Sequence, residues 1–387
     1  MAKKTLLTAN GVYSKAKKGF LTVNSTYRKV QKAYLTIGGV YRPCWSSGLE
    51  YYGTITPLSE GVTYPAATST ENFAFFAGGE KNPLTSGTGT NRYSKIVNAY
   101  DKSFTKHETG SLTLSWTHIG ATSLNTLAFF AGGSRGTETK NNDVYVVDES
   151  LSTVSVSQRL TAEFDNLSAT SVGDRVIFGG GILEGGGYSS SVFSYTASLT
   201  REDTRFVKNI GRRGATTVGN HAMFVGGMHG NASPSYGNDI DVFDSSLTTV
   251  TTSNVLSQGR AYLSGAKADN FAIFAGGIKN GTRYNIVDVF DSSLTQISGI
   301  QGLSEARSSM GATSVSGCAM FIAGEIEDGE SANVDMYDTS LTRTNPQPLP
   351  NGRNAHGVTS VRDVVLIAGG HTANTGYETM TEAYVYF

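Results

Sequence analysis

The stretch Gly311–Thr342, GATSVSGCAMFIAGEIEDGESANVDMYDTSLT, decides the fold of this chain. It predicts a short strand of small residues at Gly311–Val315 and a more continuously apolar strand at Ala319–Ala323, which ends beside Gly324. A third strand is expected at Val334–Tyr337, and the Asp-Thr-Ser-Leu-Thr that follows opens a fourth. Apolar runs bounded by Gly, Ser and Asp are typical of β-strands joined by tight turns. The stretch therefore predicts one four-stranded unit.

The apolar run that ends in Gly recurs along the chain. Counted on its first Gly, the copies are spaced by 54, 47, 47, 50, 48 and 45 residues. The copies are Phe76–Gly79, Phe130–Gly133, Ile177–Gly180, Phe224–Gly227, Phe274–Gly277, Ile322–Glu325 and Ile367–Gly370. A strand-rich period near 50 indicates a propeller with one four-stranded blade for each copy. A WD40 array would have a shorter period and Trp-Asp marks, and this chain has no Trp-Asp.

The segment Leu49–Ser59 is expected to close the ring. The last unit ends at Ala383–Phe387, which matches a third strand, so its fourth strand is missing. Leu58-Ser59-Glu60 matches Leu303-Ser304-Glu305, with the same offset to the Ala-Thr that follows. Pairing of Leu49–Ser59 with the last strand would remove both exposed sheet edges.

The apolar-Gly-Gly runs, the aromatic-Asp of the third strand and an Arg before the first strand resemble the kelch motif over roughly residues 49–387. The Trp that kelch repeats often carry near the fourth strand is absent, and the Leu of Ser-Leu-Thr stands there instead. The resemblance implies an all-β fold, a seven-bladed kelch-type β-propeller, behind a small N-terminal β-hairpin module at residues 1–48. Arg260, Arg307 and Arg353 recur in equivalent places, which favours a structural role over the alternative of substrate binding.

A second repeat, with a period of 14 residues, fills the first 45 residues. Leu6-Leu7-Thr8, Phe20-Leu21-Thr22 and Tyr34-Leu35-Thr36 each precede a turn dipeptide and a Tyr. Asn-Gly and Gly-Gly between apolar runs indicate short hairpins. Residues 1–49 hold nine basic residues and no acid, whereas the rest of the chain holds 22 of the 31 Lys and Arg residues and all 32 acids. This asymmetry indicates two modules with different partners.

The 14-residue repeat resembles repeats in tail and minor structural proteins of bacteriophages that infect Gram-positive bacteria. The resemblance implies a non-enzymatic tail or baseplate protein, made in the host cytoplasm, located in the virion and present in several copies. Its basic module would dock to other tail proteins. Nucleic acid is an alternative partner that we rank lower, because Lys on short hairpins also keeps sheet edges soluble. The expected attachment residues are Lys15, Lys17, Lys18, Arg28, Lys29, Lys32 and Arg42.

The connection between the second and third strands is long and differs in every unit, whereas the other turns within a unit are short. In a propeller this connection shares one face with the links between units, so one face is varied. Loops on a rigid scaffold commonly carry recognition, and Tyr among Asn, Ser and Gly makes an adaptable contact surface. We expect this face to bind a host-surface glycan or a neighbouring virion protein. The candidate ligand-binding residues are Arg92, Tyr93, Tyr188, His229, Tyr236, Arg283, Tyr284, His371 and Tyr377.

No catalytic constellation, cofactor or metal site is expected. The six His residues form no i,i+2 or i,i+4 pair, and Cys44 and Cys318 are far apart. Calcium is an alternative at Asp239, Asp241, Asp288 and Asp291, which we rank below ordinary strand alternation. No apolar run is long enough to span a membrane, so no membrane partner is expected.

Two other functions stay open at this point. One is an intracellular kelch adaptor of a bacterium. The other is a carbohydrate-active enzyme on a kelch scaffold, which would need acids clustered on the varied face. The acids available in these loops are Glu80, Glu138, Glu184, Glu325, Glu327, Asp328, Glu330 and Glu378.

Overall fold

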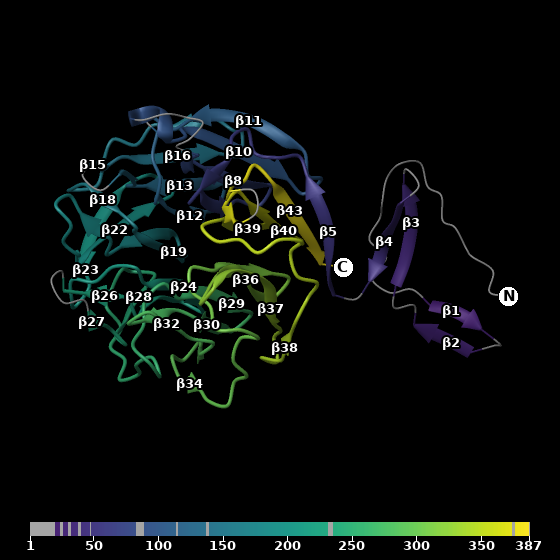
Figure 1. The fold of residues 1–387 in the computed structure, drawn as a ribbon. Helices are drawn as coiled ribbons and strands as arrows, with labels where there is room; N and C mark the ends of the chain where they lie inside the picture. The colour runs from purple at the N-terminus through teal and green to yellow at the C-terminus, as the bar shows by residue number, and fades with distance from the viewer. Residues whose placement is uncertain are drawn as a thin grey trace. The chain divides into compact units, whose positions relative to one another are not determined.

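The computed structural model describes residues 20–23, 26–29, 32–37, 40–46, 48–82, 89–113, 115–136, 139–230, 235–373 and 376–386. Six antiparallel sheets of four strands and one of three follow one another round a common axis (Figure 1). The only helical element in the described ranges is a short 3-10 turn, η1 (Gly89–Arg92). The prediction of an all-β, seven-bladed propeller is confirmed.

Each blade runs outward from the axis, and the blades are numbered 1 to 7 in the order of their first strands along the chain. The first strands are β7 (Ala66–Ser69), β12 (Gly120–Leu124), β19 (Ser168–Val172), β24 (Gly214–Val218), β29 (Ser264–Ala268), β35 (Gly311–Val315) and β39 (Gly357–Val361). The second strands are β8 (Phe73–Ala77), β13 (Leu127–Ala131), β20 (Arg175–Gly179), β25 (His221–Val225), β30 (Phe271–Ala275), β36 (Cys318–Ile326) and β40 (Val364–Ala368).

The outer half of each blade continues the same order. The third strands are β10 (Ile96–Asp101), β16 (Val144–Asp148), β22 (Ser191–Thr196), β28 (Ile240–Asp244), β33 (Val287–Asp291), β37 (Gly329–Tyr337) and β43 (Thr381–Tyr386). The fourth strands are β11 (Lys106–Ser111), β17 (Thr153–Val154), β23 (Arg201–Arg205), β34 (Gln296–Ile297), β38 (Arg343–Thr344) and β5 (Leu49–Ile55). In blade 4 a single bridge between Phe243 and Thr249 takes the place of the fourth strand.

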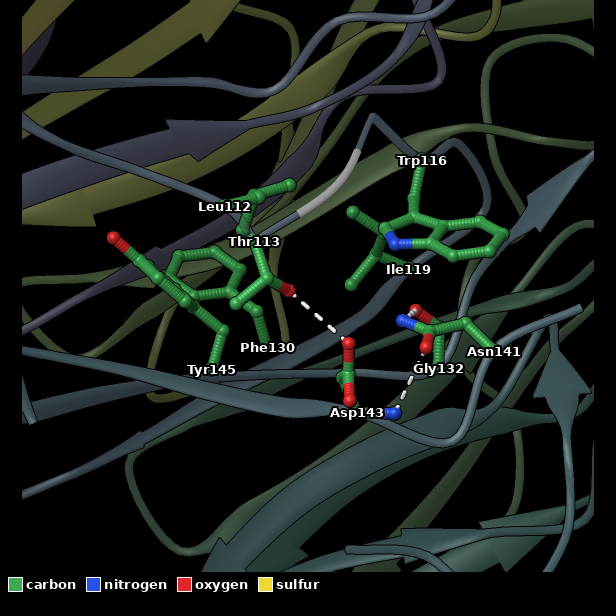
Figure 2. A pocket seen from close by; sticks show the side chains of 9 residues that line it. All are labelled: Leu112, Thr113, Trp116, Ile119, Phe130, Gly132, Asn141, Asp143 and Tyr145. Atoms are coloured by element: carbon green, nitrogen blue, oxygen red, sulfur yellow. Dashed lines mark hydrogen bonds between the residues drawn. The ribbon is translucent and has the colours of Figure 1, made fainter. Parts of the chain in front are cut away.

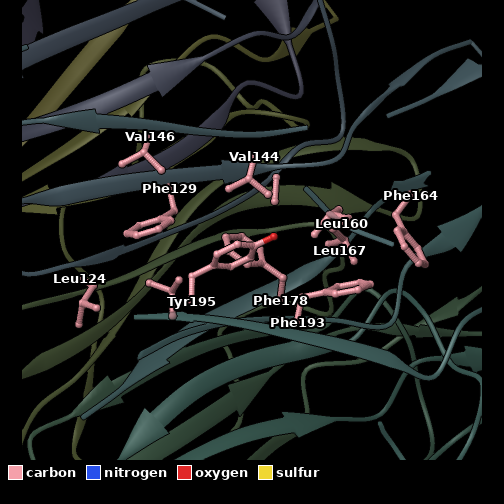
Figure 3. Close-up of a cluster of buried hydrophobic side chains, with 12 residues drawn as sticks. Leu124, Phe129, Val144, Val146, Leu160, Phe164, Leu167, Phe178, Phe193 and Tyr195 are labelled. Carbon is pink, nitrogen blue, oxygen red and sulfur yellow. The ribbon is translucent and has the colours of Figure 1, made fainter. Parts of the chain in front are cut away.

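Apolar cores fill the space between neighbouring blades. Figure 3 shows the core between blades 2 and 3, where Phe129 and Val146 of one blade pack against Phe178 and Phe193 of the next. Phe129 and Phe178 on the second strands are fully buried. Burial of one such side chain contributes on the order of 2 kcal/mol to folding. These cores hold the blades at fixed positions in the ring.

The seventh blade joins the two ends of the propeller. Its strand order is β39-β40-β43-β5, so β5 lies beside the last strand of the chain (Figure 1). Tyr51 Oη on β5 donates a hydrogen bond to Glu382 Oε1 at 2.8 Å, and the Tyr51 ring packs edge-on against Tyr384 at 5.2 Å. The strand ends at Ile55, so residues 56–59 of the expected closing segment form the link that follows it.

A pair of residues with positive φ follows the second strand in six blades, lies within β36 in blade 6, and couples each blade to the next. In blade 5 it is Gly276 and Gly277, with φ of 66° and 108°. A Cβ on Gly276 would overlap the carbonyl oxygen of Arg307 in the next blade, and Gly277 N–H donates to that oxygen at 2.8 Å. Only glycine combines this backbone conformation with such a close approach at no cost. The apolar-Gly-Gly marker is therefore the joint between blades.

Two copies of this marker are shifted from their predicted places. In blade 3 the pair with positive φ is Gly180 and Gly181, one residue later than the Gly179-Gly180 counted in the sequence. In blade 6 it is Ala323 and Gly324, one residue earlier than Gly324-Glu325. In blade 3 the first Gly of the run, Gly179, is still part of strand β20. In blade 6 the first residue of the pair is Ala323, which a search for glycine does not find.

Seven backbone bridges show which connections share a face. In every blade a residue of the link before the first strand pairs with a residue 17 positions later, just after the second strand. The pairs are Thr63–Glu80, Thr117–Ser134, Asp165–Ile182, Gly211–Met228, Ala261–Ile278, Ser308–Glu325 and Asn354–His371. Links between blades and the long connections therefore lie together, and we call this surface the loop face.

Short hairpins and bridges elaborate the loop face. They are β6 (Val62–Thr63) with β9 (Glu80–Lys81), β14 (Ser134–Arg135) with β15 (Thr139–Lys140), β18 (Phe164–Asp165) with β21 (Ile182–Leu183), β26 (Met228–His229) with β27 (Ser235–Tyr236), β31 (Ile278–Lys279) with β32 (Thr282–Arg283), and β41 (His371–Thr372) with β42 (Gly376–Tyr377). In blade 6 the connection is a direct extension of β36 and β37.

The opposite face carries uniform turns. In the turn after β33, Asp291 Oδ1 accepts hydrogen bonds from the N–H groups of Ser293 and Thr295, at 2.9 and 2.8 Å, and Leu294 has a φ of 63°. Asp101, Asp148, Asp244 and Asp338 make the same pair of bonds. The Asp-x-Ser-Leu-Thr stretch is thus a turn motif, as its residue types predicted.

A second compact unit precedes the propeller, and the division falls after Glu50. It contains two antiparallel hairpins, β1 (Phe20–Val23) with β2 (Thr26–Lys29) and β3 (Lys32–Ile37) with β4 (Val40–Ser46). These are the second and third copies of the 14-residue repeat. The first copy lies outside the described residues.

The recurring arginines are structural. Arg260, Arg307 and Arg353 are fully buried and form ion pairs with Asp288, Asp335 and Glu382 on the third strands. Each also donates to a backbone carbonyl of its own second strand or of the residues that follow it. A fourth pair, Arg213–Asp241 at 2.5 Å, was missed in the sequence, because Arg213 is not at the equivalent position. These four arginines are held inside the blades by their carboxylate partners.

Candidate binding face

Four of the nine predicted ligand-binding residues lie where blades 7 and 1 adjoin. His371 and Tyr377 face each other across β41 and β42, with ring centroids 6.0 Å apart. Arg92 in η1 donates from Nε to Glu80 Oε1 at 2.6 Å, and this hydrogen bond raises the pKa of Arg92. Burial and the charge of Glu80 raise the pKa of Tyr377, while Arg92 opposes them, so charges of blade 1 act on blade 7.

Tyr93 contributes less than expected to this surface. It is only 8% exposed, and it bridges Glu80 through the backbone. Burial is also the main cause that raises its pKa. The prediction that Tyr93 offers a contact surface is therefore wrong for most of its side chain.

Ion pairs on the loop face also cross from blade 5 to blade 6 and from blade 6 to blade 7. Arg283 of blade 5 contacts Glu325 at 3.2 Å and Glu327 at 3.8 Å, both in blade 6. His371 of blade 7 in turn contacts Glu330 of blade 6 through Nδ1 at 3.1 Å. These contacts orient the charged side chains before any ligand arrives. Tyr284, beside Arg283, is half-buried.

The remaining predicted residues lie in blades 3 and 4. Tyr188 Oη donates to Met228 Sδ at 3.9 Å, across the boundary between these blades. His229 Nδ1 lies 2.9 Å from Ser235 Oγ, at the exposed end of the β26–β27 hairpin. Tyr236 is partly exposed on β27. The nine residues thus form a discontinuous arc rather than one cluster.

Most of the loop carboxylates already have partners. Glu80, Glu325 and Glu330 pair with a basic residue of the same face, as described above, and Glu184 Oε2 accepts the N–H of Lys140 at 2.8 Å. Glu378 is 8% exposed and contacts Thr372. Glu138 lies outside the described residues. This pairing favours a role in shaping the face over a role in acid–base chemistry.

A small cavity lies between blades 1 and 2. Leu112, Trp116, Phe130 and Tyr145 supply its apolar wall (Figure 2). The volume of the cavity is about 10 Å³. Two of its polar side chains are engaged, since Thr113 donates to Asp143 at 3.1 Å and Asn141 Nδ2 donates to Gly132 O at 3.1 Å, whereas Trp116 Nε1 is buried without a partner among the described residues (Figure 2). Such a space admits no more than about one water molecule.

Sequence reasoning missed a ring of residues around the axis at the loop face. Each lies one position after a bridge of the loop face and adopts a left-handed backbone with φ between 51° and 60°. The seven are Tyr64, His118, Asn166, Arg212, Tyr262, Ser309 and Ala355. We call them the axial ring. Each precedes the first residue of its positive-φ pair by 14 positions, and that constant offset is the signal that could have found them.

The acids considered for calcium have other roles. Asp241 and Asp288 pair with buried arginines, Asp291 holds a turn, and Asp239 contacts Lys208 Nζ at 2.5 Å. Among the described residues, no three His, Cys, Asp or Glu side chains are grouped so that they could hold a metal ion. Cys318 is 3% exposed, and burial raises the pKa of its thiol.

The expected attachment residues are described only through their backbone. Arg28 and Lys29 lie on β2, Lys32 begins β3, and Arg42 lies on β4. Lys15, Lys17 and Lys18 lie outside the described residues.

No family model matches the chain, and no curated protein shows significant similarity to it. Within the described part of the chain, no helix has the length and apolar character needed to cross a membrane.

Proposed function

We propose that this protein is a non-enzymatic component of a bacteriophage tail or baseplate, with a kelch-type propeller that binds through its loop face. The observation that carries the proposal is the contrast between the two faces. One face repeats the same Asp-centred turn, whereas the other presents connections of different length and composition held by ion pairs between blades. A rigid ring with one varied, preorganised face is suited to recognition.

The proposed ligand is a host-surface glycan or a neighbouring virion protein. Tyr236 and Arg283 offer partly exposed side chains of the kind that make adaptable contacts. The hairpins of the basic N-terminal unit would dock the protein to the particle, which the resemblance of the 14-residue repeat supports. In this proposal the protein is located in the virion and its partners are other tail proteins.

Binding of the purified chain to cell-wall polysaccharides of Gram-positive bacteria tests the proposal. We expect Tyr236→Ala with Tyr284→Ala to reduce retention on immobilised polysaccharide at least several-fold. Thr126→Ala, at an exposed turn of the opposite face, is the matched control and should bind normally. Unchanged retention of the double variant would count against the glycan as ligand. Release of soluble sugars during incubation would instead favour the carbohydrate-active enzyme.

A second measurement addresses the location. An antibody against the propeller should label tails of purified phage particles that carry this gene. Particles without label, together with free protein in the host lysate, would contradict a virion component.

A further inference from the structure

Backbone hydrogen bonds link several members of the axial ring to one another. The N–H of Tyr64 donates to Ala355 O at 2.6 Å, which joins blade 1 to blade 7. Asn166 N–H donates to His118 O, and Tyr262 N–H donates to Arg212 O. Together with Ser309 N–H, which donates to Tyr262 O at 3.0 Å, these bonds join members of the axial ring across four of the blade boundaries. Their side chains belong to the loop face, because each directly follows a bridge that defines it.

Four members of the ring form two flat stacks. The rings of Tyr64 and His118 lie 4.3 Å apart with an interplanar angle of 31°, and Tyr64 is 42% exposed. The guanidinium of Arg212 lies over the ring of Tyr262, 4.7 Å from its centroid. Tyr64 is one of the most exposed large hydrophobic residues in the described part of the chain. It offers a flat apolar surface beside the axis.

Arg212 is a cation without a carboxylate partner among the described residues. Its Nε is shielded from water and has no acceptor there. The carboxylates that face this part of the ring are engaged elsewhere, since Glu80 pairs with Arg92 and Glu325 with Arg283. Five other arginines also have an Nε without an acceptor, but each of them pairs with a carboxylate; they are Arg213, Arg283, Arg307, Arg343 and Arg353. Stacking on Tyr262 therefore orients the Arg212 guanidinium and leaves N–H donors of this group available for a ligand.

The charge of Arg212 in one stack acts on both members of the other stack. Burial lowers the pKa of His118 and raises that of Tyr64, and the charge of Arg212 lowers both. Arg212 therefore lies within electrostatic reach of the Tyr64–His118 stack. The same region holds a flat apolar surface and an unneutralised planar cation. Ser309 and Ala355 bring the least bulk to the remaining part of the ring.

We propose that the axial ring binds a sugar ring that carries an acidic group, either a carboxylate or a phosphate. The apolar face of the sugar would lie on Tyr64, and the acidic group would accept two hydrogen bonds from Arg212. A planar guanidinium matches both kinds of anion in this bidentate way. This inference rests on the proposed function and deepens it, because it places an acidic part of the glycan at the axis.

Titration of the full chain with small saccharides tests the inference. The probes are glucuronic acid, glucose 1-phosphate and glucose, at low ionic strength, followed by calorimetry or by ligand-observed NMR. We expect both acidic sugars to bind at least tenfold more tightly than glucose. Arg212→Gln should abolish this preference, Arg212→Lys should keep part of it, and Tyr64→Ala should weaken all three sugars.

Arg362→Gln is the matched control. Arg362 has the same left-handed backbone, with a φ of 54°, but it lies in a turn between first and second strands and pairs with Glu71. It should leave binding of every sugar unchanged. Loss of preference in this variant, or an unchanged preference in Arg212→Gln, would overturn the inference. Tighter binding of tetraglutamate than of glucuronic acid would also overturn it, in favour of an acidic peptide.

The outcome separates this inference from the proposed function. If Arg212→Gln retains wild-type binding to polysaccharide while the double Tyr236 and Tyr284 variant loses it, the axial site is wrong and the loop face stands. If no polysaccharide binds wild type although acidic sugars do, the axial site stands and the proposed glycan ligand fails. Thermal unfolding of each variant shows whether the ring survives the substitution.

Discussion

Blades 1–3 and blades 4–7 fill the same buried position in different ways. The position lies on the third strand, opposite an aromatic residue or Ile of the second strand. In the first three blades it holds Asn98, Tyr145 or Phe193. In the other four it is an acid paired with a buried Arg. Blade 3 places Phe164 against Phe193 at 5.3 Å, where blade 6 has Arg307 against Asp335.

The difference shows what the position requires. The carbonyl of the first joint residue is buried and needs a donor, which Arg260 supplies at 2.6 Å to Gly276 O in blade 5. In blade 2 the amide of Asn141 serves the equivalent Gly132 O at 3.1 Å, so the space left free can hold Trp116 and Tyr145. The buried carbonyl must have a hydrogen-bond donor in both groups of blades. That donor can be a charged Arg or a neutral amide.

The largest expected effect comes from breaking one ion pair of the second group. Arg307→Met leaves Asp335 as a buried charge that has lost its main partner. We expect the free energy of unfolding to fall by about 3–5 kcal/mol, which is the usual cost of removing one member of a buried pair. Urea denaturation followed by tryptophan fluorescence measures it.

The double variant Arg307→Met with Asp335→Leu makes blade 6 resemble blade 3. Because the desolvation penalty disappears with both charges, it should recover most of the loss. If the double variant is as unstable as the single one, the carbonyl that Arg307 serves matters more than the charge on Asp335. The two groups of blades would then not be interchangeable.

A smaller effect is expected from pH. His356 follows the axial ring in blade 7, where blades 1–3 have Pro65, Ile119 and Leu167. Both of its ring nitrogens are shielded and unpartnered among the described residues, and burial together with Arg353 lowers the pKa of His356 from 6.5 to about 3. The unfolded chain therefore takes up a proton below pH 6.5 that the folded chain refuses. This part of the stability is present above pH 6.5 and is lost as the pH falls towards 3.

Chemical denaturation at pH 7 and pH 5 measures the effect. His356 alone should remove about 2 kcal/mol between these values, since one pKa unit corresponds to about 1.4 kcal/mol. His356→Leu gives blade 7 an apolar residue at this position, as in blades 2 and 3. The free energy of unfolding of this variant should fall by about 2 kcal/mol less than that of the wild type between pH 7 and pH 5. An equal loss in both proteins would assign the acid sensitivity to other groups.

The sequence predicted the number of blades because the joint between them needs glycine, and glycine is visible in the sequence. It failed where geometry, not residue type, recurs. Ala323 takes the conformation of a joint glycine, and Arg213 reaches Asp241 from a position that the other arginines do not use. The axial ring was missed for the same reason, since its members share φ but no chemistry. Exposure was also hidden, as Tyr93 shows.

The smallest effect is the difference in strength between one hydrogen bond with a charged acceptor and its counterpart with a neutral acceptor. Ser304 Oγ donates to Asp335 Oδ2 at 2.9 Å in blade 6, and Ser59 Oγ donates to Asn98 Oδ1 at 2.9 Å in blade 1. In both blades the backbone N–H of the same Ser also donates to that side chain, at 3.0 and 3.1 Å. The two sites differ in the charge of the acceptor and in an exposed hydrogen bond that Ser59 Oγ accepts from Lys106 Nζ at 3.2 Å.

We expect Ser304→Ala to lower the free energy of unfolding by about 1.5–3 kcal/mol and Ser59→Ala by about 0.5–1.5 kcal/mol, because bonds to charged acceptors are the stronger ones. Thermal and urea denaturation of the two variants under the same conditions gives the ratio. Equal losses would mean that Arg307 neutralises Asp335 so completely that the carboxylate behaves as an amide. The two groups of blades would then be equivalent in energy as well as in shape.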